Sequence, residues 1–260
     1  MPQQSFDFTN RRGLTLAARI DLPGNGPAIA HALFAHCFTC GKDIKAAYHI
    51  ARALNQEGIG VVRFDFTGLG ASQGEFADTN FSSNVSDLID AAGHMAAQGM
   101  APQMLIGHSL GGAAVIQAAT GVDSVRAVVA IAAPSEPGHL ARHMEGIHET
   151  LARDGRADLT IAGQTVTITP QFLDDIAGVD METVLKNLNR ALLILHSPRD
   201  TVVHIDHAAR LYRTARHPKS FVSLDTADHL LTDPRDSRYA AGIIAAWVRR
   251  YLPPDPKATT

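Results

Sequence analysis

Short apolar runs alternate with amphipathic stretches along most of the 260-residue chain. Nearly continuous apolar runs are typical of strands buried on both faces of a sheet. Between the runs, apolar residues recur every three or four positions, which indicates helices that bury one side. The alternation predicts a largely parallel sheet with helices on both faces. The runs occupy residues 30–35, 59–66, 104–106, 125–132, 191–195 and 221–224.

The N-terminal residues follow a different pattern, in which apolar and polar positions alternate. Phe6 and Phe8 precede the turn-forming residues 10–13, and further apolar residues follow at Leu14 and Leu16. A period of two is typical of strands with one buried face. We expect two antiparallel strands here, ahead of the parallel sheet.

The rhythm breaks between residues 135 and 190, a stretch too long for a plain connection. Apolar and threonine residues at 159–161 and 166–168 flank Ala162-Gly163-Gln164 and predict a hairpin. We expect residues 135–190 to form a cap over the active site, inserted into a core of residues 1–134 and 191–252. We expect residues 253–260 to be a proline-rich tail or linker stub.

A candidate nucleophile lies where the run at 104–106 meets an apolar helix. Gly107-His108-Ser109-Leu110-Gly111 has the Gly-x-Ser-x-Gly pattern of a nucleophile elbow, in which a serine occupies a sharp strand-to-helix turn. Glycines two positions before and after the serine leave room for that turn. The alternative is a glycine-rich turn with an incidental serine, and the strand and helix on either side argue against it.

A serine nucleophile needs a base, usually histidine, that is oriented by a carboxylate. In this architecture the acid and the base follow later strands, acid first. Asp200 follows the run at 191–195, and His229 follows the run at 221–224. We therefore predict Ser109, Asp200 and His229 as the catalytic residues. Asp206 is less favoured because it is expected to lie within a helix, and Asp228 because it is next to His229 in sequence. The histidines that precede the last strand are less favoured as the base: His204, His207 and His217.

Main-chain N–H groups are expected to form the oxyanion hole. The residue after the nucleophile supplies one donor, here Leu110, and the loop after residues 30–35 supplies the other. Phe38 is the favoured second donor, with Cys37 as the alternative.

Composition excludes several other classes. The formal net charge of −3, without a basic patch, does not suggest nucleic-acid binding. The first residues lack the pattern of a signal peptide, and no apolar run is long enough to span a bilayer. We expect a cytoplasmic protein that acts on a small molecule, without a membrane, metal or cofactor.

These motifs occur in the order typical of the α/β-hydrolase superfamily, which the chain resembles over nearly its whole length. The resemblance implies an α/β-hydrolase fold with a mostly parallel eight-stranded sheet. The segments 34–43, 63–70 and 217–221 also resemble the hydrolase half of bacterial hydrolase–OsmC fusion proteins. That closer resemblance implies a serine esterase with an OsmC-like domain as a possible fused or separate partner. The superfamily commonly has His-Gly where this chain has His36-Cys37.

The sequence thus predicts a cofactor-free carboxylic ester hydrolase acting through an acyl-enzyme on short to medium acyl esters. Alternatives are a thioesterase, a peptidase, a haloperoxidase-like enzyme with the same triad, and a binding or regulatory module that has kept the fold. Ile147 and Leu151 of the expected cap are further apolar candidates for substrate contact. The main candidate pocket residues are His36, Cys37, His108, Phe172 and Leu173.

Several other features have an ordinary structural interpretation that we favour. Cys37 and Cys40 have the spacing of a redox motif, but lie outside a thioredoxin-like unit and are expected to be packing thiols. Arg199 and Asp65 are expected to form ordinary surface or loop ion pairs, with support of active-site loops as the alternative. The histidines at 139, 143 and 148 lack the His-Glu-x-x-His pattern of a metal site, and Gly68, Gly70 and Gly74 fit no nucleotide-binding motif.

Overall fold

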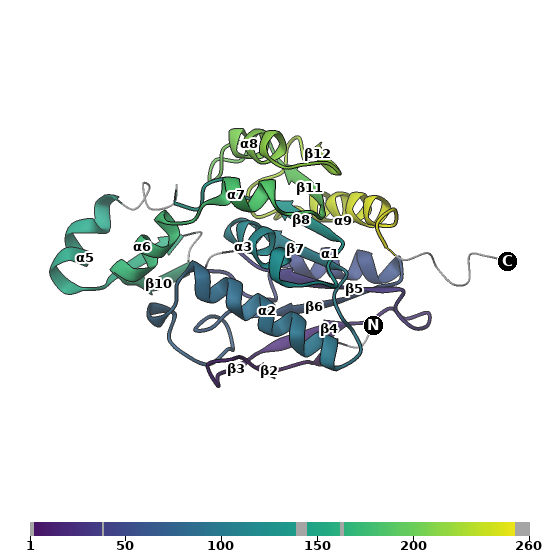
Figure 1. The fold of residues 1–260 in the computed structure, drawn as a ribbon, viewed down its shortest axis with the longest axis horizontal. Helices are drawn as coiled ribbons and strands as arrows, with labels where there is room; N and C mark the ends of the chain where they lie inside the picture. Colours follow the sequence, from purple (N-terminus) through teal and green to yellow (C-terminus); the bar gives the residue numbers. More distant parts are fainter. Residues whose placement is uncertain (1–2, 38, 139–144, 162–163, 253–260) are drawn as a thin grey trace.

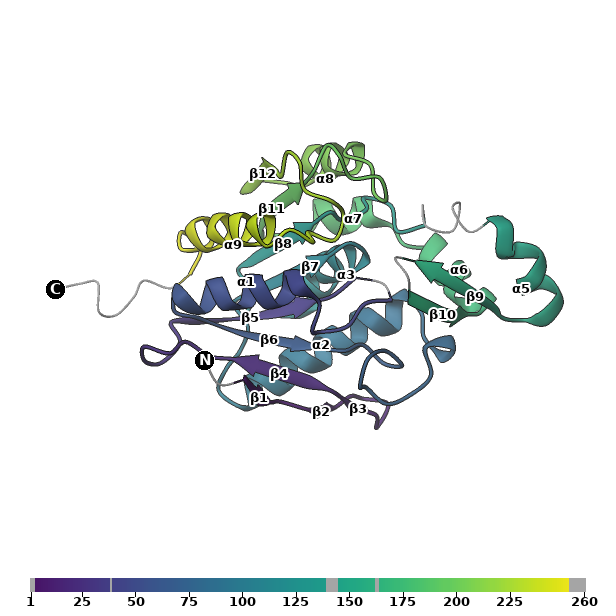
Figure 2. The same cartoon turned by 180° about the vertical axis from the view of Figure 1, so that it is seen from behind.

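The computed structural model describes residues 3–37, 39–138, 145–161 and 164–252. An eight-stranded sheet crosses the molecule, with helices on both faces (Figures 1 and 2). Five of its seven strand pairs are parallel, and the two pairs nearest the N-terminal edge are antiparallel. In spatial order the strands are β1 (Gln3–Ser5), β4 (Ala18–Asp21), β6 (Ile59–Phe64), β5 (Ala30–Ala35), β7 (Met104–His108), β8 (Ala127–Ile131), β11 (Ala191–His196) and β12 (Lys219–Ser223).

The expected N-terminal hairpin is present but short. Strand β2 (Phe8–Thr9) pairs with β3 (Thr15–Leu16) around the predicted turn at 10–13. The chain beyond this hairpin continues into β4, which leaves it and joins the main sheet between β1 and β6. Ile20 therefore belongs to a different sheet from Phe8. Alternation of apolar and polar residues predicts a strand, but it does not show which sheet the strand joins.

Each central strand contributes to two separate cores. Leu33 of β5 and Leu105 of β7 are buried on the side covered by α2 (Phe81–Ala97), α3 (Leu110–Ala118) and α8 (Asp206–Thr214). The next residues, Phe34 and Ile106, are buried on the side covered by α1 (Lys45–Gln56) and α9 (Pro234–Val248). Side chains alternate across a strand, so an apolar run can fill both cores, as the continuous runs predict.

The segment between β8 and β11 has structure of its own. The expected hairpin is formed by β9 (Ala157–Ile161) and β10 (Gln164–Ile168), which pair antiparallel. Around it lie η3 (Glu145–Ile147), α5 (His148–Asp154), α6 (Pro170–Ala177) and α7 (Met181–Lys186). The hairpin, α5 and α6 form one end of the molecule (Figures 1 and 2). Two further short 3₁₀ helices are η1 (Phe76–Asp78) and η2 (Ala119–Gly121).

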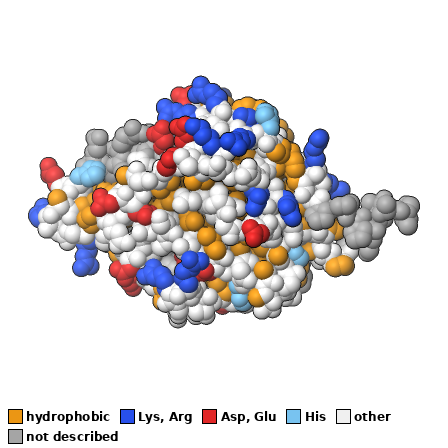
Figure 3. Space-filling model, in the orientation of Figure 1, with side chains coloured by type: hydrophobic (Ala, Val, Ile, Leu, Met, Phe, Trp, Pro, Cys, Tyr) orange, Lys and Arg blue, Asp and Glu red, His pale blue; other side chains and the backbone are white. Residues whose placement is uncertain are grey.

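On the face shown in Figure 3, acidic and basic side chains are interspersed. None of the described helices has both the length and the apolar character needed to cross a membrane.

A pair of glycine substitutions tests how closely the elements approach. A Cβ on Gly111 would overlap the carbonyl oxygen of His36, whereas a Cβ on Gly93, inside α2, would meet nothing within 4 Å. Gly111→Ala should lower the free energy of unfolding by about 1–3 kcal/mol. Gly93→Ala should raise it by about 0.5–1 kcal/mol, because alanine favours a helix over glycine. Urea unfolding followed by circular dichroism measures both, and an unchanged Gly111→Ala variant would contradict the close contact.

Candidate active site

Ser109 occupies a sharp turn between β7 and α3. Its backbone has φ 55° and ψ −126°, a region that residues with a side chain rarely adopt. A Cβ on Gly107 would overlap the Gly111 carbonyl oxygen, and one on Gly111 would overlap the His36 carbonyl oxygen. The glycines of the motif are therefore required by close backbone packing, as the sequence predicts.

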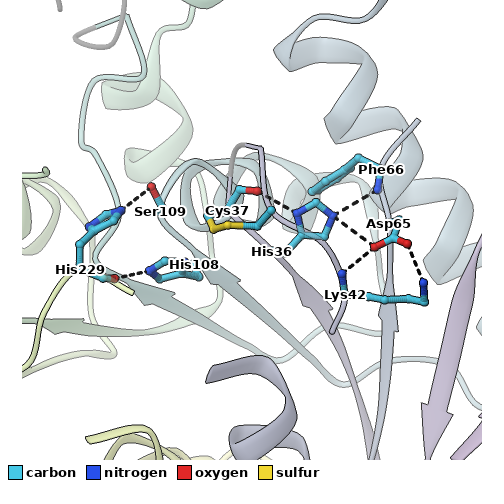
Figure 4. The surroundings of a disulfide bond; sticks show 9 residues. His36, Cys37, Lys42, Asp65, Phe66, His108, Ser109 and His229 are labelled. Atoms are coloured by element: carbon cyan, nitrogen blue, oxygen red, sulfur yellow. Dashed lines mark hydrogen bonds and ion pairs between the residues drawn. A yellow bond between two sulfur atoms is a disulfide. The ribbon is translucent and has the colours of Figure 1, made fainter. Parts of the chain in front are cut away.

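The structure brings the three predicted catalytic side chains together. His229 Nε2 lies 3.1 Å from Ser109 Oγ, and His229 Nδ1 lies 2.7 Å from Asp200 Oδ2. Ser109 follows β7, Asp200 follows β11 and His229 follows β12, so all three lie beyond the carboxyl ends of parallel strands. Each residue is less than a tenth exposed. Figure 4 shows the Ser109–His229 contact.

The Asp200 carboxylate is held by main-chain donors as well as by His229. Its Oδ1 accepts the N–H groups of Val202 and Val203, each at 2.9 Å. Burial pushes the pKa of Asp200 upward, but the hydrogen bonds from His229 and these N–H groups outweigh it and lower the pKa below its ordinary value. Asp200 is therefore ionised at neutral pH. Asp206 instead begins helix α8 and pairs with His204 at 3.1 Å.

Two buried histidines flank this arrangement. His108 Nε2–H donates to the His229 carbonyl oxygen at 2.6 Å, and His196 Nε2–H donates to the Val203 carbonyl oxygen at 2.8 Å. Burial is the main cause that lowers the pKa of His108 to about 3, and it also lowers the pKa of His196. Both rings are neutral at pH 7 and orient the loops that carry His229 and Asp200. His108 was expected to line the substrate pocket; it supports the His229 main chain instead. Sequence reasoning missed His196, although it ends the strand that leads to Asp200.

Leu110 is the first residue of α3, so its N–H has no acceptor within that helix. This N–H directly follows Ser109 in the chain, where the first oxyanion donor is expected. Phe38, the expected second donor, lies outside the described residues.

Cys37 and Cys40 form a disulfide, with Cα atoms 5.2 Å apart. The expectation of free packing thiols is therefore wrong. Cys40 N–H donates to the Cys37 carbonyl oxygen at 3.1 Å, and this tight turn brings the two residues together. The spacing of two residues between the cysteines does not by itself predict this turn.

A buried polar cluster lies behind the same loop (Figure 4). His36 Nδ1–H donates to the Cys37 carbonyl oxygen at 2.8 Å, and His36 Nε2 accepts the Phe66 N–H at 3.4 Å. Asp65 Oδ1 accepts the Lys42 N–H, and Asp65 Oδ2 pairs with Lys42 Nζ, both at 2.6 Å. His36 is fully buried, so it supports the loop rather than presenting its ring to a pocket.

Asp65 is 1% exposed and Lys42 is 7% exposed, so Asp65 forms a loop ion pair, as expected, but a buried one. Burial pushes the pKa of Asp65 upward, but hydrogen bonds from Ala71 N–H and from Lys42 outweigh it and lower the pKa. The pair holds the loops after β5 and β6 together. Arg199 is exposed, and its N–H donates to Ser197 Oγ at 3.1 Å.

A cavity of about 660 Å³ lies beside the site. Its walls come from the loops after β5 and β6, from η1, from β10 and from the loop that carries His229. Neither Phe172 nor Leu173 is among its wall residues; both are buried, and the Phe172 ring lies 6.0 Å from the Phe76 ring. The walls are residues 39–41, 44–45, 68–70, 75–77, 165–167, 230 and 232.

Within the described residues, no group of three or more His, Cys, Asp or Glu side chains is arranged to hold a metal ion. His139 and His143, considered above as ligands, lie outside those residues.

The fold and the site define an α/β-hydrolase, and solved structures agree. The esterase domain of a Rhodothermus marinus protein is 45% identical in sequence and superimposes with a TM-score of 0.81, over 97% of this chain and 100% of that chain. Est1E from Butyrivibrio proteoclasticus, solved with bound ferulic acid, is 18% identical and superimposes with a TM-score of 0.82, over 95% of this chain and 99% of that chain.

The family is defined by a match over residues 31–174 to the model described as serine aminopeptidase, S33, and the chain belongs to this family. A more distant relative is YfhR of Escherichia coli strain K12, described as uncharacterized. It is 23% identical over 231 residues, which cover 87% of this chain and 73% of YfhR.

The buried ion pair predicts a pH-dependent stability. Asp65→Asn leaves the Lys42 charge without its main partner and should cost about 3 kcal/mol of unfolding free energy. Because the pKa of Asp65 is lowered on folding, its contribution is present above the ordinary carboxylate pKa near 4 and is lost as the pH falls through the lower folded value. Urea unfolding at several pH values should therefore show the difference between wild type and Asp65→Asn shrinking below about pH 4.

The matched control is Asp90→Asn, which breaks the pair between Asp90 and Arg11, whose side chain is 54% exposed. An exposed pair contributes no more than about 1 kcal/mol. Equal losses from the two substitutions would contradict the structural role of Asp65.

Proposed function

We propose that the protein is a serine carboxylic ester hydrolase that works through an acyl-enzyme. The observation that carries this proposal is the hydrogen-bonded series from Asp200 through His229 to Ser109, with Ser109 in a strained turn ahead of α3. The 45% identity to a domain described as an esterase supports the same activity.

In this mechanism Ser109 Oγ attacks the acyl carbonyl carbon while His229 Nε2 takes the hydroxyl proton. The His229 ring then carries a positive charge, which the ionised Asp200 stabilises through Nδ1–H. His229 next gives the proton to the leaving alcohol, and the acyl group remains on Ser109. Water deprotonated by His229 releases the acid and restores the serine.

The developing oxyanion would be bound by main-chain donors. The Leu110 N–H is one, and the N–H of Phe38 is the second, with Cys37 as the alternative. Because such donors need fixed positions, the bond from His36 to Cys37 and the bond from Lys42 to Asp65, which hold the loop after β5, support this assignment.

The substrate side of the proposal is a small ester with a short to medium acyl chain. The cavity beside the His229 loop can hold a ligand of that size, since small-molecule sites are typically about 300–1,000 Å³. We propose this cavity, rather than Phe172 and Leu173, as the part that distinguishes substrates. We expect the reaction in the cytoplasm and without a cofactor.

A second candidate is peptide hydrolysis at the same triad, which the aminopeptidase description of the family favours. A panel of acyl esters of graded chain length, with thioesters and aminoacyl amides, discriminates between the two. Esterase activity predicts the highest kcat/KM on an ester, and a preference for aminoacyl amides would overturn it.

Ser109→Ala should abolish ester hydrolysis and labelling by a fluorophosphonate while the fold stays intact. The loss in kcat should be about 10⁴-fold or more, because the base then has no nucleophile to activate. The measurements are turnover of a chromogenic acetate, probe labelling and circular dichroism. Retention of more than a few per cent of the activity would mean that another residue is the nucleophile.

Asp200→Asn should reduce kcat strongly, because an amide neither stabilises the charged His229 ring nor fixes its tautomer. Asp206→Asn is the matched control, since Asp206 is exposed on α8 and pairs with His204. Its kcat should stay close to wild type. Comparable losses in both variants would remove Asp200 as the specific acid.

A further inference from the structure

The Cys37–Cys40 disulfide lies inside the loop that is proposed to bind the oxyanion. Cys37 comes two residues after β5 ends at Ala35, and the loop runs close to Ser109 and His229 (Figure 4). The start of α3 touches the loop directly, because Gly111 has no room for a Cβ beside the His36 carbonyl oxygen. The loop and the nucleophile elbow are therefore in direct contact.

Hydrogen bonds hold both ends of the loop. At one end His36 Nδ1–H donates to the Cys37 carbonyl oxygen, and at the other Asp65 accepts the Lys42 N–H. The disulfide adds a covalent cross-link between Cys37 and Cys40, within the stretch that these bonds enclose. Its reduction leaves the residues after Cys37 tethered by weaker contacts, with more conformational freedom.

The two cysteines differ in accessibility. Cys37 is 4% exposed, whereas Cys40 is partly exposed and forms part of the wall of the 660 Å³ cavity. A thiol reagent that enters the cavity therefore reaches Cys40 first. The cavity is the one proposed above to hold the substrate.

Cys37 is suited to be the leaving group in such an exchange. It lines a small void together with Leu110 and Gly111, the first two residues of α3. A helix N-terminus favours negative charge, so this position suits the sulfur that leaves as a thiolate. The Asn84 side chain lines the same void, and its Oδ1 has no hydrogen-bond partner among the described residues, so it can accept from a thiol formed there.

We propose that Cys37–Cys40 is a reversible redox site that regulates the hydrolase, with the oxidised form active and the reduced form impaired. The inference rests on the proposed function, since it concerns the oxyanion loop of that same reaction. Disulfides in a reducing compartment are usually transient and redox-sensing, which agrees with the expected cytoplasmic setting.

The reductant is a dithiol. One of its thiolates attacks Cys40 Sγ, the disulfide bond breaks, and the electron pair passes to Cys37 Sγ. The second thiolate of the dithiol then attacks the dithiol sulfur that is bonded to Cys40, and Cys40 leaves as a thiolate. The dithiol leaves as a cyclic disulfide, two electrons remain on the protein, and its two protons end on Cys37 and Cys40.

The test measures activity and thiol content together in buffers of graded reduced-to-oxidised dithiothreitol ratio. Wild-type turnover of a chromogenic acetate is followed, and free thiols are counted by mass after maleimide alkylation. Loss of one oxyanion donor costs about 10²–10³-fold in kcat, so a loosened donor should cost at least about tenfold. We expect kcat to fall as thiols appear, to return on reoxidation, and circular dichroism to stay unchanged.

Cys37→Ser and Cys40→Ser are the controls, because neither can form the bond. Each should have the activity of reduced wild type in every buffer, with the fold confirmed by circular dichroism. Full activity in a folded Cys40→Ser variant overturns the inference. So does a wild-type rate that rises or stays constant while thiols appear, or a disulfide that resists excess dithiothreitol in the folded protein.

Fluorophosphonate labelling separates this failure from that of the proposed function. Oxidised wild type that cleaves no ester and takes no label overturns the esterase proposal, and with it the inference. Oxidised wild type that is active and labelled, but indifferent to reduction, overturns the redox site alone.

Discussion

The left-handed backbone of Ser109 is the constraint on which the rest of the site depends. A residue with a side chain in such a region costs on the order of 1–3 kcal/mol, so the surrounding structure must hold it there. The Ser109 N–H donates to the Ile131 carbonyl oxygen of β8 at 2.8 Å, and its own carbonyl oxygen accepts the Gly112 N–H at 2.8 Å. The turn is thus fixed by a neighbouring strand on one side and by α3 on the other.

Four charged residues form a connected cluster beside the loop after β5. Arg63 of β6 donates to Asp21 at 2.8 Å through Nε and to the Lys42 carbonyl oxygen at 2.5 Å through Nη1. Lys42 in turn pairs with Asp65. Burying these charges is costly unless every partner is well placed, so the cluster accepts few alternative loop conformations.

The elements of the fold and the main candidate site could be predicted because they follow local rules. An apolar run as long as residues 191–195 indicates a buried strand, and parallel strands bring their carboxyl ends to one edge, where Asp200 and His229 meet Ser109. The sequence also indicated the β9–β10 hairpin, because its apolar residues flank a glycine-containing turn.

Other features depend on contacts between distant segments. The Cys37–Cys40 bond needs a backbone turn, and the burial of Asp65 needs the loops after β5 and β6 to fold together. Phe172 looked available for substrate in the sequence, but in the structure it packs beside Phe76, about a hundred residues earlier in the chain. Apolar character predicts burial, and it does not say whether the neighbour is substrate or protein.

The order of the strands has a consequence for how activity is lost. Ser109 follows β7, which lies between β5 and β8, whereas His229 follows β12, the last strand at one margin of the sheet. Strand β12 is only partly buried, and Phe221 within it is 42% exposed. Margins of a fold open with a smaller free energy than the centre. Detachment of β12 would carry His229, the proposed base, away from Ser109, against the pairing of β12 with β11 and the His108 bond to the His229 carbonyl oxygen. Loss of activity by this route would not require the rest of the sheet to unfold.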